Sequence, residues 1–189
     1  MRLFLAITLP AGLRDELARR AGVLRHELPR ATWVRPESMH LTLHFFGERE
    51  PARAAAIAAA LRAALEEQQP FTLRTATAGA FPRASRPQVV WLGLDDSSAL
   101  AVLDARVRET LRTLDEPIED RPFHGHVTLL RCKARYGREH VDRIARALAD
   151  LAGIELPVRE ATLFESLLRP EGAKHEVLAR LPLGAQAQF

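Results

Sequence analysis

The sequence predicts an α+β protein made of two similar lobes that face each other. Strand-like and helix-like segments alternate along its 189 residues. A strand–helix–strand–helix–strand order begins near Arg2 and begins again near Gln88, 86 residues later. The same offset relates the pattern RPxxxHxTL at Arg35 to its copy at Arg121. We therefore expect one domain over residues 1–189, with two intimately packed lobes and sequence repeats at about 2–87 and 88–182.

In the first half, each predicted strand is a short run rich in apolar residues. Each predicted helix begins at a proline, which fits the first helical turn because its missing N–H would have no partner there. The predicted elements are a strand at 2–8, a helix from 10 to about 28, a strand at 40–46 closed by Gly47, a helix from 51 to about 67 and a strand at 71–80.

The second half repeats this order after a strand at 88–94. Ser97 or Ser98 is expected to cap a helix that runs to about residue 114, because a serine hydroxyl can accept from the free N–H groups of the first turn. A charged connection at 115–122 leads to the remaining elements, which are a strand at 126–131, a helix near 138–151 and strands at 155–165 and 175–181.

Composition limits the class of protein. With 47% hydrophobic and 27% charged residues, the chain is typical of a soluble globular protein. A single cysteine, Cys132, excludes an intrachain disulfide and argues against zinc fingers and iron–sulfur clusters. We recognise no transmembrane or targeting segment and expect a cytoplasmic monomer that does not bind membranes.

Arginine supplies almost all of the positive charge, with 25 Arg against two Lys and a net charge of +3. The planar guanidinium suits phosphate oxygens, which favours a phosphate-bearing partner. A general bias toward Ala and Arg explains the arginines as well, and the excess charge is too small to establish nucleic-acid binding by itself.

The chemistry of the repeat lies in two His-x-Thr strands. Side chains two apart in a strand point to one face, so His40 shares a face with Thr42, and His126 with Thr128. If the lobes face each other about a pseudo-twofold axis, two imidazoles and two hydroxyls converge on one cleft. Such a cleft suits displacement at phosphorus, since one imidazole can take a proton from water while the other protonates the leaving oxygen.

Arg131 stands at an odd offset from His126 and would point away along an ideal strand. A strand end or a β-bulge would bring it back to the phosphate. His44 and His124 lie on the ideal faces of His40 and His126, and four imidazoles invite a metal site. We do not favour a metal, because neither motif carries the adjacent Asp or Glu of a two-metal phosphoesterase.

Other features have both a functional and a purely structural interpretation. The basic stretch from Arg131 to Arg138 and the pair Arg83 and Arg86 would steer an RNA backbone or simply solvate loops. Four aromatic residues are candidates for stacking a terminal base, namely Trp33, Trp91, Phe81 and Phe123. Aromatic residues on strands are more often buried, so only Phe123, beside the second motif, keeps a functional interpretation.

These motifs carry a family resemblance over nearly the whole chain. The segment WVRPESMHLTLHFFGE at 33–48 and FHGHVTLLR at 123–131 resemble the two motifs of the 2H phosphoesterase superfamily. The segments around Ala80-Phe81-Pro82, Arg86-Pro87 and VWLGL at 90–94 resemble the middle of its RNA 2′,3′-cyclic phosphodiesterase branch, historically called 2′-5′ RNA ligase. Glu165-Ser166 with Pro170 and Gly172 resembles its last strand pair. Two positions depart from the family pattern: Gly125 replaces a common proline, and His175 a common tyrosine.

The resemblance implies a bilobal fold of mostly antiparallel sheet with helices on the outer faces and a central cleft. It also implies an enzyme without metal or cofactor that opens the 2′,3′-cyclic phosphate at an RNA end, such as that of a tRNA fragment, to a 2′-phosphomonoester. By microscopic reversibility, the same site would join a 2′,3′-cyclic end to a 5′ hydroxyl and give a 2′-5′ linkage. The family pattern makes His126 the base and His40 the acid, with Thr42, Thr128 and Arg131 holding the phosphate, although the near-symmetric sequence leaves the order of acid and base open.

Two other functions stay open at this point. The same site would suit a small cyclic nucleotide or an ADP-ribose cyclic phosphate. A non-catalytic RNA-binding module is the second alternative, and the intact threonines of both motifs argue against it.

Overall fold

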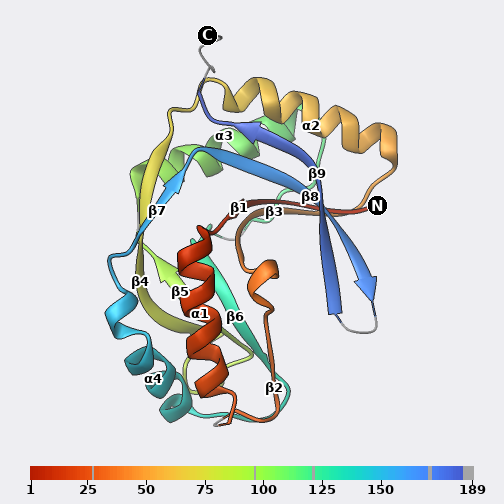
Figure 1. Cartoon of the computed structure of the whole chain (residues 1–189). Helices are drawn as coiled ribbons and strands as arrows, with labels where there is room; N and C mark the ends of the chain where they lie inside the picture. The colour runs from red at the N-terminus through yellow and green to blue at the C-terminus, as the bar shows by residue number, and fades with distance from the viewer. Residues whose placement is uncertain (27, 96, 121, 170–171, 185–189) are drawn as a thin grey trace.

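The computed structural model describes residues 1–26, 28–95, 97–120, 122–169 and 172–184 (Figure 1). Within them lies one antiparallel sheet in which the main strand order is β7-β4-β5-β6-β3-β1-β8-β9, with β2 paired to β6. The elements in chain order are β1 (Arg2–Thr8), α1 (Ala11–Leu24), β2 (Ala31–Trp33), η1 (Pro36–Ser38), β3 (His40–Glu48), α2 (Pro51–Leu65), β4 (Phe71–Phe81), β5 (Val89–Leu94), α3 (Ser98–Thr113), β6 (His126–Cys132), α4 (Arg138–Ala147), η2 (Ala149–Leu151), β7 (Glu155–Val158), β8 (Glu160–Arg169) and β9 (Gly172–Pro182).

Most predicted elements are present, and several differ. Helices α1 and α4 end at Leu24 and Ala147, each four residues before the predicted end. The strand predicted at 155–165 is two strands, because β7 pairs with β4 while β8 pairs with β1. At Arg159 the chain therefore passes from the edge strand β7 to β8, which lies in the other half of the sheet. Strand β2 was not predicted, since its three residues are too few to show a period.

The two lobes do not coincide with the two halves of the sequence. One half of the sheet holds β6-β5-β4-β7 and the other β3-β1-β8-β9, so β4 joins strands of the second repeat, and β8 and β9 join strands of the first. The helices are exchanged in the same way: α1 lies beside α4 and η2, and α2 packs on α3 and β9 (Figure 1). Each lobe is thus built from both repeats.

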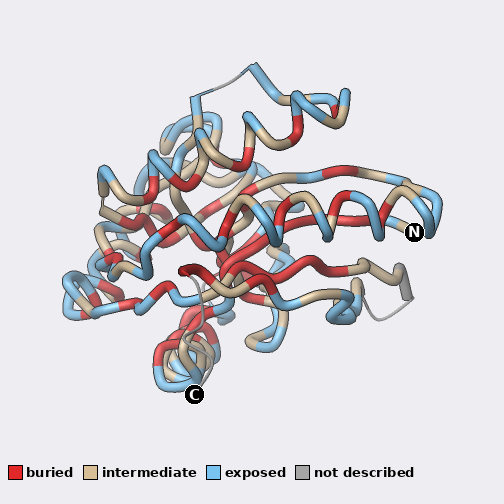
Figure 2. The backbone as a smooth tube through the Cα atoms, turned by 90° about the horizontal axis from the view of Figure 1, so that it is seen from above, coloured by how far each residue is buried: buried red, intermediate tan, exposed pale blue. Residues whose placement is uncertain are grey.

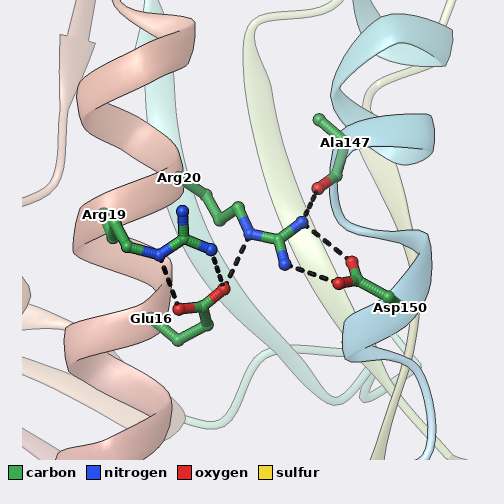
Figure 3. Close-up of polar contacts among 5 residues, drawn as sticks. All are labelled: Glu16, Arg19, Arg20, Ala147 and Asp150. Carbon is green, nitrogen blue, oxygen red and sulfur yellow. Dashed lines mark hydrogen bonds and ion pairs between the residues drawn. The ribbon is translucent and has the colours of Figure 1, made fainter.

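Arg20 connects α1 to the end of α4 (Figure 3). Its guanidinium donates to Glu16 at 2.7 Å, to the carbonyl oxygen of Ala147 at 2.5 Å, and to both carboxylate oxygens of Asp150 at 2.8 and 2.5 Å. Hydrogen bonds from Arg19 and Arg20 lower the pKa of Glu16 to about 2. These contacts fix the two helices of this lobe against each other.

A buried carboxylate organises the other lobe. Glu116, in the connection after α3, has a side chain only 2% exposed. It accepts from Arg49 at 2.7 and 2.9 Å and from Arg53 at 2.6 Å. Burial raises the pKa of this carboxyl, but the hydrogen bonds from the two arginines outweigh burial and leave it lowered. The charged connection predicted at 115–122 is therefore anchored on the start of α2.

The main core lies between the sheet and the helices, and the middle strands are the most continuously buried part of the chain (Figure 2). A second, small cluster of Phe4, Ala6 and Phe164 lies on the opposite face of β1 and β8. This second face is the one that carries the candidate site. No helix in the described part of the chain is long and apolar enough to cross a membrane.

Candidate active site

The two His-x-Thr strands meet at the centre of the sheet. Strands β3 and β6 are antiparallel, with Leu41 paired to Val127. These residues are equivalent in the two repeats, 86 positions apart, so the local twofold axis passes between them. Both side chains are fully buried in the helix-side core. Continuing this register places His40 opposite Thr128 and Thr42 opposite His126 on the other face.

A β-bulge directly after each His-x-Thr motif brings two further residues to this face. In β3, Thr42 pairs with Ala6 and His44 with Leu5, so Leu43 is the extra residue. In β6, Thr128 pairs with Trp91 and Leu130 with Val90, so Leu129 is the extra residue. A bulge shifts the alternation of the side chains that follow it. Phe45 and Arg131, again 86 positions apart, therefore join the threonine face.

The expected bulge for Arg131 is thus present, and the expectation for His44 is wrong. His44 is the partner of Leu5, which belongs to the helix-side core, and its ring lies 4.7 Å from that of Phe46. Burial, and next the charge of Arg108, lower the pKa of His44. Because His44 faces the helices, it cannot join His40 in a metal site. Among the described residues, no three His, Cys, Asp or Glu side chains come together as a metal site would require.

A cavity of about 320 Å³ opens on the threonine face. Four of the five predicted site residues line it, namely His40, Thr42, Thr128 and Arg131. The fifth, His126, does not line the cavity, but it is close enough to His40 to lower the pKa of that ring. Arg2 and Arg35 also line the cavity, and no described Asp or Glu does. The cavity is therefore electropositive and suits an anion.

Each histidine is oriented by the backbone two residues before it. His126 Nδ1 lies 2.7 Å from the carbonyl oxygen of His124. His40 hydrogen-bonds with the backbone of Ser38, the equivalent position in the first repeat. A carbonyl can only accept, so Nδ1 of His126 carries the proton and Nε2 keeps a free lone pair.

Burial keeps both imidazoles uncharged. It lowers the pKa of His40 to about 4, helped by the neighbouring His175 and opposed by the hydrogen bond to Ser38. Burial also lowers the pKa of His126, against the effect of its hydrogen bond with the His124 backbone. Without a bound anion, both rings are therefore neutral near pH 7.

Aromatic rings surround each histidine, and the sequence favoured a core position for two of them, Phe81 and Trp91. The His40 ring lies 4.8 Å from Phe4 and 5.4 Å from His175. The His126 ring lies 5.0 Å from Phe81 and 6.1 Å from Trp91. Trp91 lies beside the site because it pairs with Thr128 across the strands. The sequence alone does not reveal that register, so it could not separate Trp91 from the core aromatics.

Phe123, the aromatic residue favoured from the sequence, lies elsewhere. It packs against the helix-side core and lines a different hollow, together with Ser97 and Leu100 at the start of α3. His124 lies beside the site, with its ring 6.2 Å from that of His126 and 4.8 Å from that of Trp91. His175 lines the cavity, and its Nδ1 is buried without a hydrogen-bond partner among the described residues.

The fold, with its paired His-x-Thr strands on a twofold axis, is that of a two-histidine phosphoesterase. A family model described as LigT-like phosphoesterase matches the chain twice, at residues 7–91 and 92–174. The chain belongs to this family. The two successive matches agree with the internal repeat.

Named relatives and solved structures support the assignment. A Methanothermobacter thermautotrophicus protein named RNA 2′,3′-cyclic phosphodiesterase is 31% identical over 176 residues, covering 91% of this chain and 93% of the relative. One of the same name from Geobacillus stearothermophilus is 30% identical over 95% of this chain, which spans only 56% of that relative's length. The crystal structure of Escherichia coli LigT complexed with 3′-AMP has a TM-score of 0.77 and 28% identity, covering 96% of this chain and 97% of LigT.

Proposed function

We propose that the protein is an RNA 2′,3′-cyclic phosphodiesterase that opens the cyclic phosphate at an RNA end to a 2′-phosphomonoester. The observation that carries this proposal is the pairing of Leu41 with Val127, which sets two histidines about one axis beside an electropositive cavity. The names of the relatives above point to the same substrate. We further propose that the protein is a cytoplasmic monomer and that its substrates are RNA fragments, including those of tRNA.

In this mechanism His126 is the general base. Its Nδ1–H donates to the His124 carbonyl, which leaves Nε2 to take a proton from water. The water oxygen bonds to phosphorus as the bond from phosphorus to the 3′ oxygen breaks on the opposite side. His40 then donates a proton to that oxygen, giving a 3′ hydroxyl and a 2′-phosphate. Aligned acid and base groups of this kind each contribute about 10²–10⁴ in rate.

Three side chains hold the phosphate during this step. The hydroxyls of Thr42 and Thr128 donate to non-bridging oxygens, and the Arg131 guanidinium balances their charge. Because the two threonines lie on either side of the twofold axis, they hold phosphorus midway between the histidines. The same geometry, with a 5′ hydroxyl in place of water as the nucleophile, forms a 2′-5′ linkage as the 3′ oxygen leaves.

The acid role of His40 depends on the substrate. With a pKa of about 4, only about one molecule in a thousand carries the proton on His40 at pH 7. A phosphate anion bound next to the ring favours the charged imidazole and raises this pKa. Substrate binding therefore protonates His40 for its role as the acid, whereas in water alone the ring stays uncharged.

The test uses a short RNA ending in 2′,3′-cyclic phosphate, with the product's phosphate position read by chromatography against 2′- and 3′-phosphate standards. We expect a 2′-phosphate from the wild type and no measurable product from His40→Ala or His126→Ala. His44→Gln is the matched control, because it alters a histidine of the same strand that faces the helices, and it should keep its activity.

Other outcomes separate the alternatives. Turnover of mononucleotide or ADP-ribose cyclic phosphates, but not of RNA, would show that the substrate is a small molecule. If RNA binding survives both histidine substitutions and no product forms, the protein is a non-catalytic RNA-binding module. Activity lost with EDTA and restored by a divalent metal would contradict the metal-free mechanism.

A further inference from the structure

Along β1 and β3, the threonine face presents three kinds of side chain in succession. Thr42 pairs with Ala6, next comes Phe45 paired with Phe4, and last comes Arg2 paired with Glu48. All but Ala6 and Glu48 line the cavity. The face thus passes from the phosphate-holding residues over an aromatic pair to a cation.

The spacing of these residues suits one nucleotide. Arg2 lies four residues from Ala6 along β1, which corresponds to roughly 13 Å at the strand rise. An arginine side chain reaches back over part of this distance. Between the two ends, the rings of Phe4 and Phe45 lie 5.5 Å apart and nearly parallel, and Phe45 is 49% exposed. A nucleoside attached to a phosphate at Thr42 has the exposed ring of Phe45, backed by the buried Phe4, to lie on before the chain reaches Arg2.

Arg2 is available for an anion. Its side chain is exposed, and among the described residues it has no hydrogen-bond or ion-pair partner. The carboxylate of its cross-strand neighbour Glu48 pairs with the amino group of Met1 at 3.4 Å. Toward the other end of the cavity, Arg131 follows Thr128 on the bulged strand, and Arg35 already interacts within the protein. Arg2 is therefore the cavity cation left for a second anionic group.

The chemistry of the substrate identifies that group. In an RNA ending in a 2′,3′-cyclic phosphate, the nearest other charge is the phosphodiester on the 5′ oxygen of the terminal nucleoside. A cyclic mononucleotide lacks it. We propose that Arg2 binds this phosphodiester and thereby makes the site select the end of an RNA chain over a free cyclic mononucleotide. The inference rests on the proposed function, whose reaction it does not alter.

The experiment measures binding of the reaction products, so that it reports even if turnover fails. The probes are adenosine 2′-phosphate and the dinucleotide CpA carrying a 2′-phosphate, titrated calorimetrically into wild type, Arg2→Gln and Arg2→Lys. Arg62→Gln, on the exposed side of α2, is the control for the loss of one positive charge. A dinucleotide with a neutral methylphosphonate linkage tests the contact from the ligand's side.

We expect Arg2→Gln to weaken dinucleotide binding about fivefold to tenfold and to leave adenosine 2′-phosphate unchanged. Arg2→Lys should recover part of the loss. The salt dependence of log Kd for the dinucleotide should become shallower by about 0.7, the value for one phosphate contact on a single strand. The methylphosphonate ligand should bind the wild type as weakly as the normal dinucleotide binds Arg2→Gln, with no further loss on that variant.

Equal losses on both ligands would overturn the inference, as would no loss at all. It is also overturned if Arg35→Gln, and not Arg2→Gln, removes the preference for the dinucleotide, because the RNA would then leave the site toward β2. If binding follows the expectation while the cyclic substrates are not turned over, the Arg2 contact stands and the proposed reaction fails.

Discussion

His40 should make the folded protein sensitive to mild acid. Its pKa is about 4 in the folded protein and 6.5 in the unfolded chain. Between these values the unfolded chain binds the extra proton, so stability falls as pH falls below 6.5 and stops falling below about 4. Integrating this linkage from pH 7 to pH 5 gives a loss of about 2 kcal/mol from His40 alone.

The substitution His40→Gln removes this proton uptake. Urea unfolding at pH 7 and pH 5 should show that the variant loses about 2 kcal/mol less stability than the wild type over this range. The comparison uses the change with pH, so packing lost in the variant cancels. His26→Gln, at an exposed position after α1, should lose as much as the wild type. Equal losses in wild type and His40→Gln would refute the argument that burial holds this imidazole neutral.

Three further predictions concern activity and stability. Since burial lowers the pKa of both site histidines, kcat/KM should be maximal on the acid side of pH 6.5 and fall about tenfold per unit on the alkaline limb, as a pH–rate series would show. Glu116→Gln should cost about 2–3 kcal/mol in urea unfolding at pH 7, somewhat less than a fully buried pair because its two arginines are partly exposed. Gly79→Ala should lower kcat about tenfold in single-turnover assays, because the added Cβ overlaps the Trp91 indole beside His126.

Each of these predictions has a result that contradicts it. A kcat/KM optimum above pH 7.5 would mean that the free enzyme holds a charged imidazole. If wild type and Glu116→Gln lose the same stability as pH falls through the lowered pKa of Glu116, the buried carboxylate does not contribute as a charge. Gly22→Ala, where a Cβ meets nothing within 4 Å, should leave kcat unchanged. Equal effects of the two glycine substitutions on kcat would contradict the claim that displacement of Trp91 disturbs His126.

The sequence predicted the site through its repeat, and the bulges explain where it failed. Ideal alternation placed His44 with His40 and left Arg131 on the wrong face. One extra residue in each strand, Leu43 and Leu129, reverses both placements. A bulge depends on how a strand pairs with its neighbour, and strand pairing is a tertiary property that a single strand's pattern does not contain.

The arrangement of the lobes was beyond local patterns for the same reason. The periodicity of residues 155–165 is that of a strand throughout, yet Arg159 separates a partner of β4 from a partner of β1. Likewise, Trp91 and Phe81 were indistinguishable from core aromatics until the pairing of β4 with β5 and of β5 with β6 placed them beside His126. Residue type and spacing predicted the chemistry, and long-range strand pairing determined which rings surround it.

The pairing of Leu41 with Val127 also bears on how a symmetric centre acquires direction. Two copies of one half-chain meeting across this axis would offer water and the leaving oxygen identical surroundings. Joined in one polypeptide, the halves can differ at equivalent positions, and residue 45 is Phe where its counterpart 131 is Arg. Covalent fusion therefore permits a polarity that a dimer of identical halves cannot have, even though the strands that carry the histidines remain nearly the same.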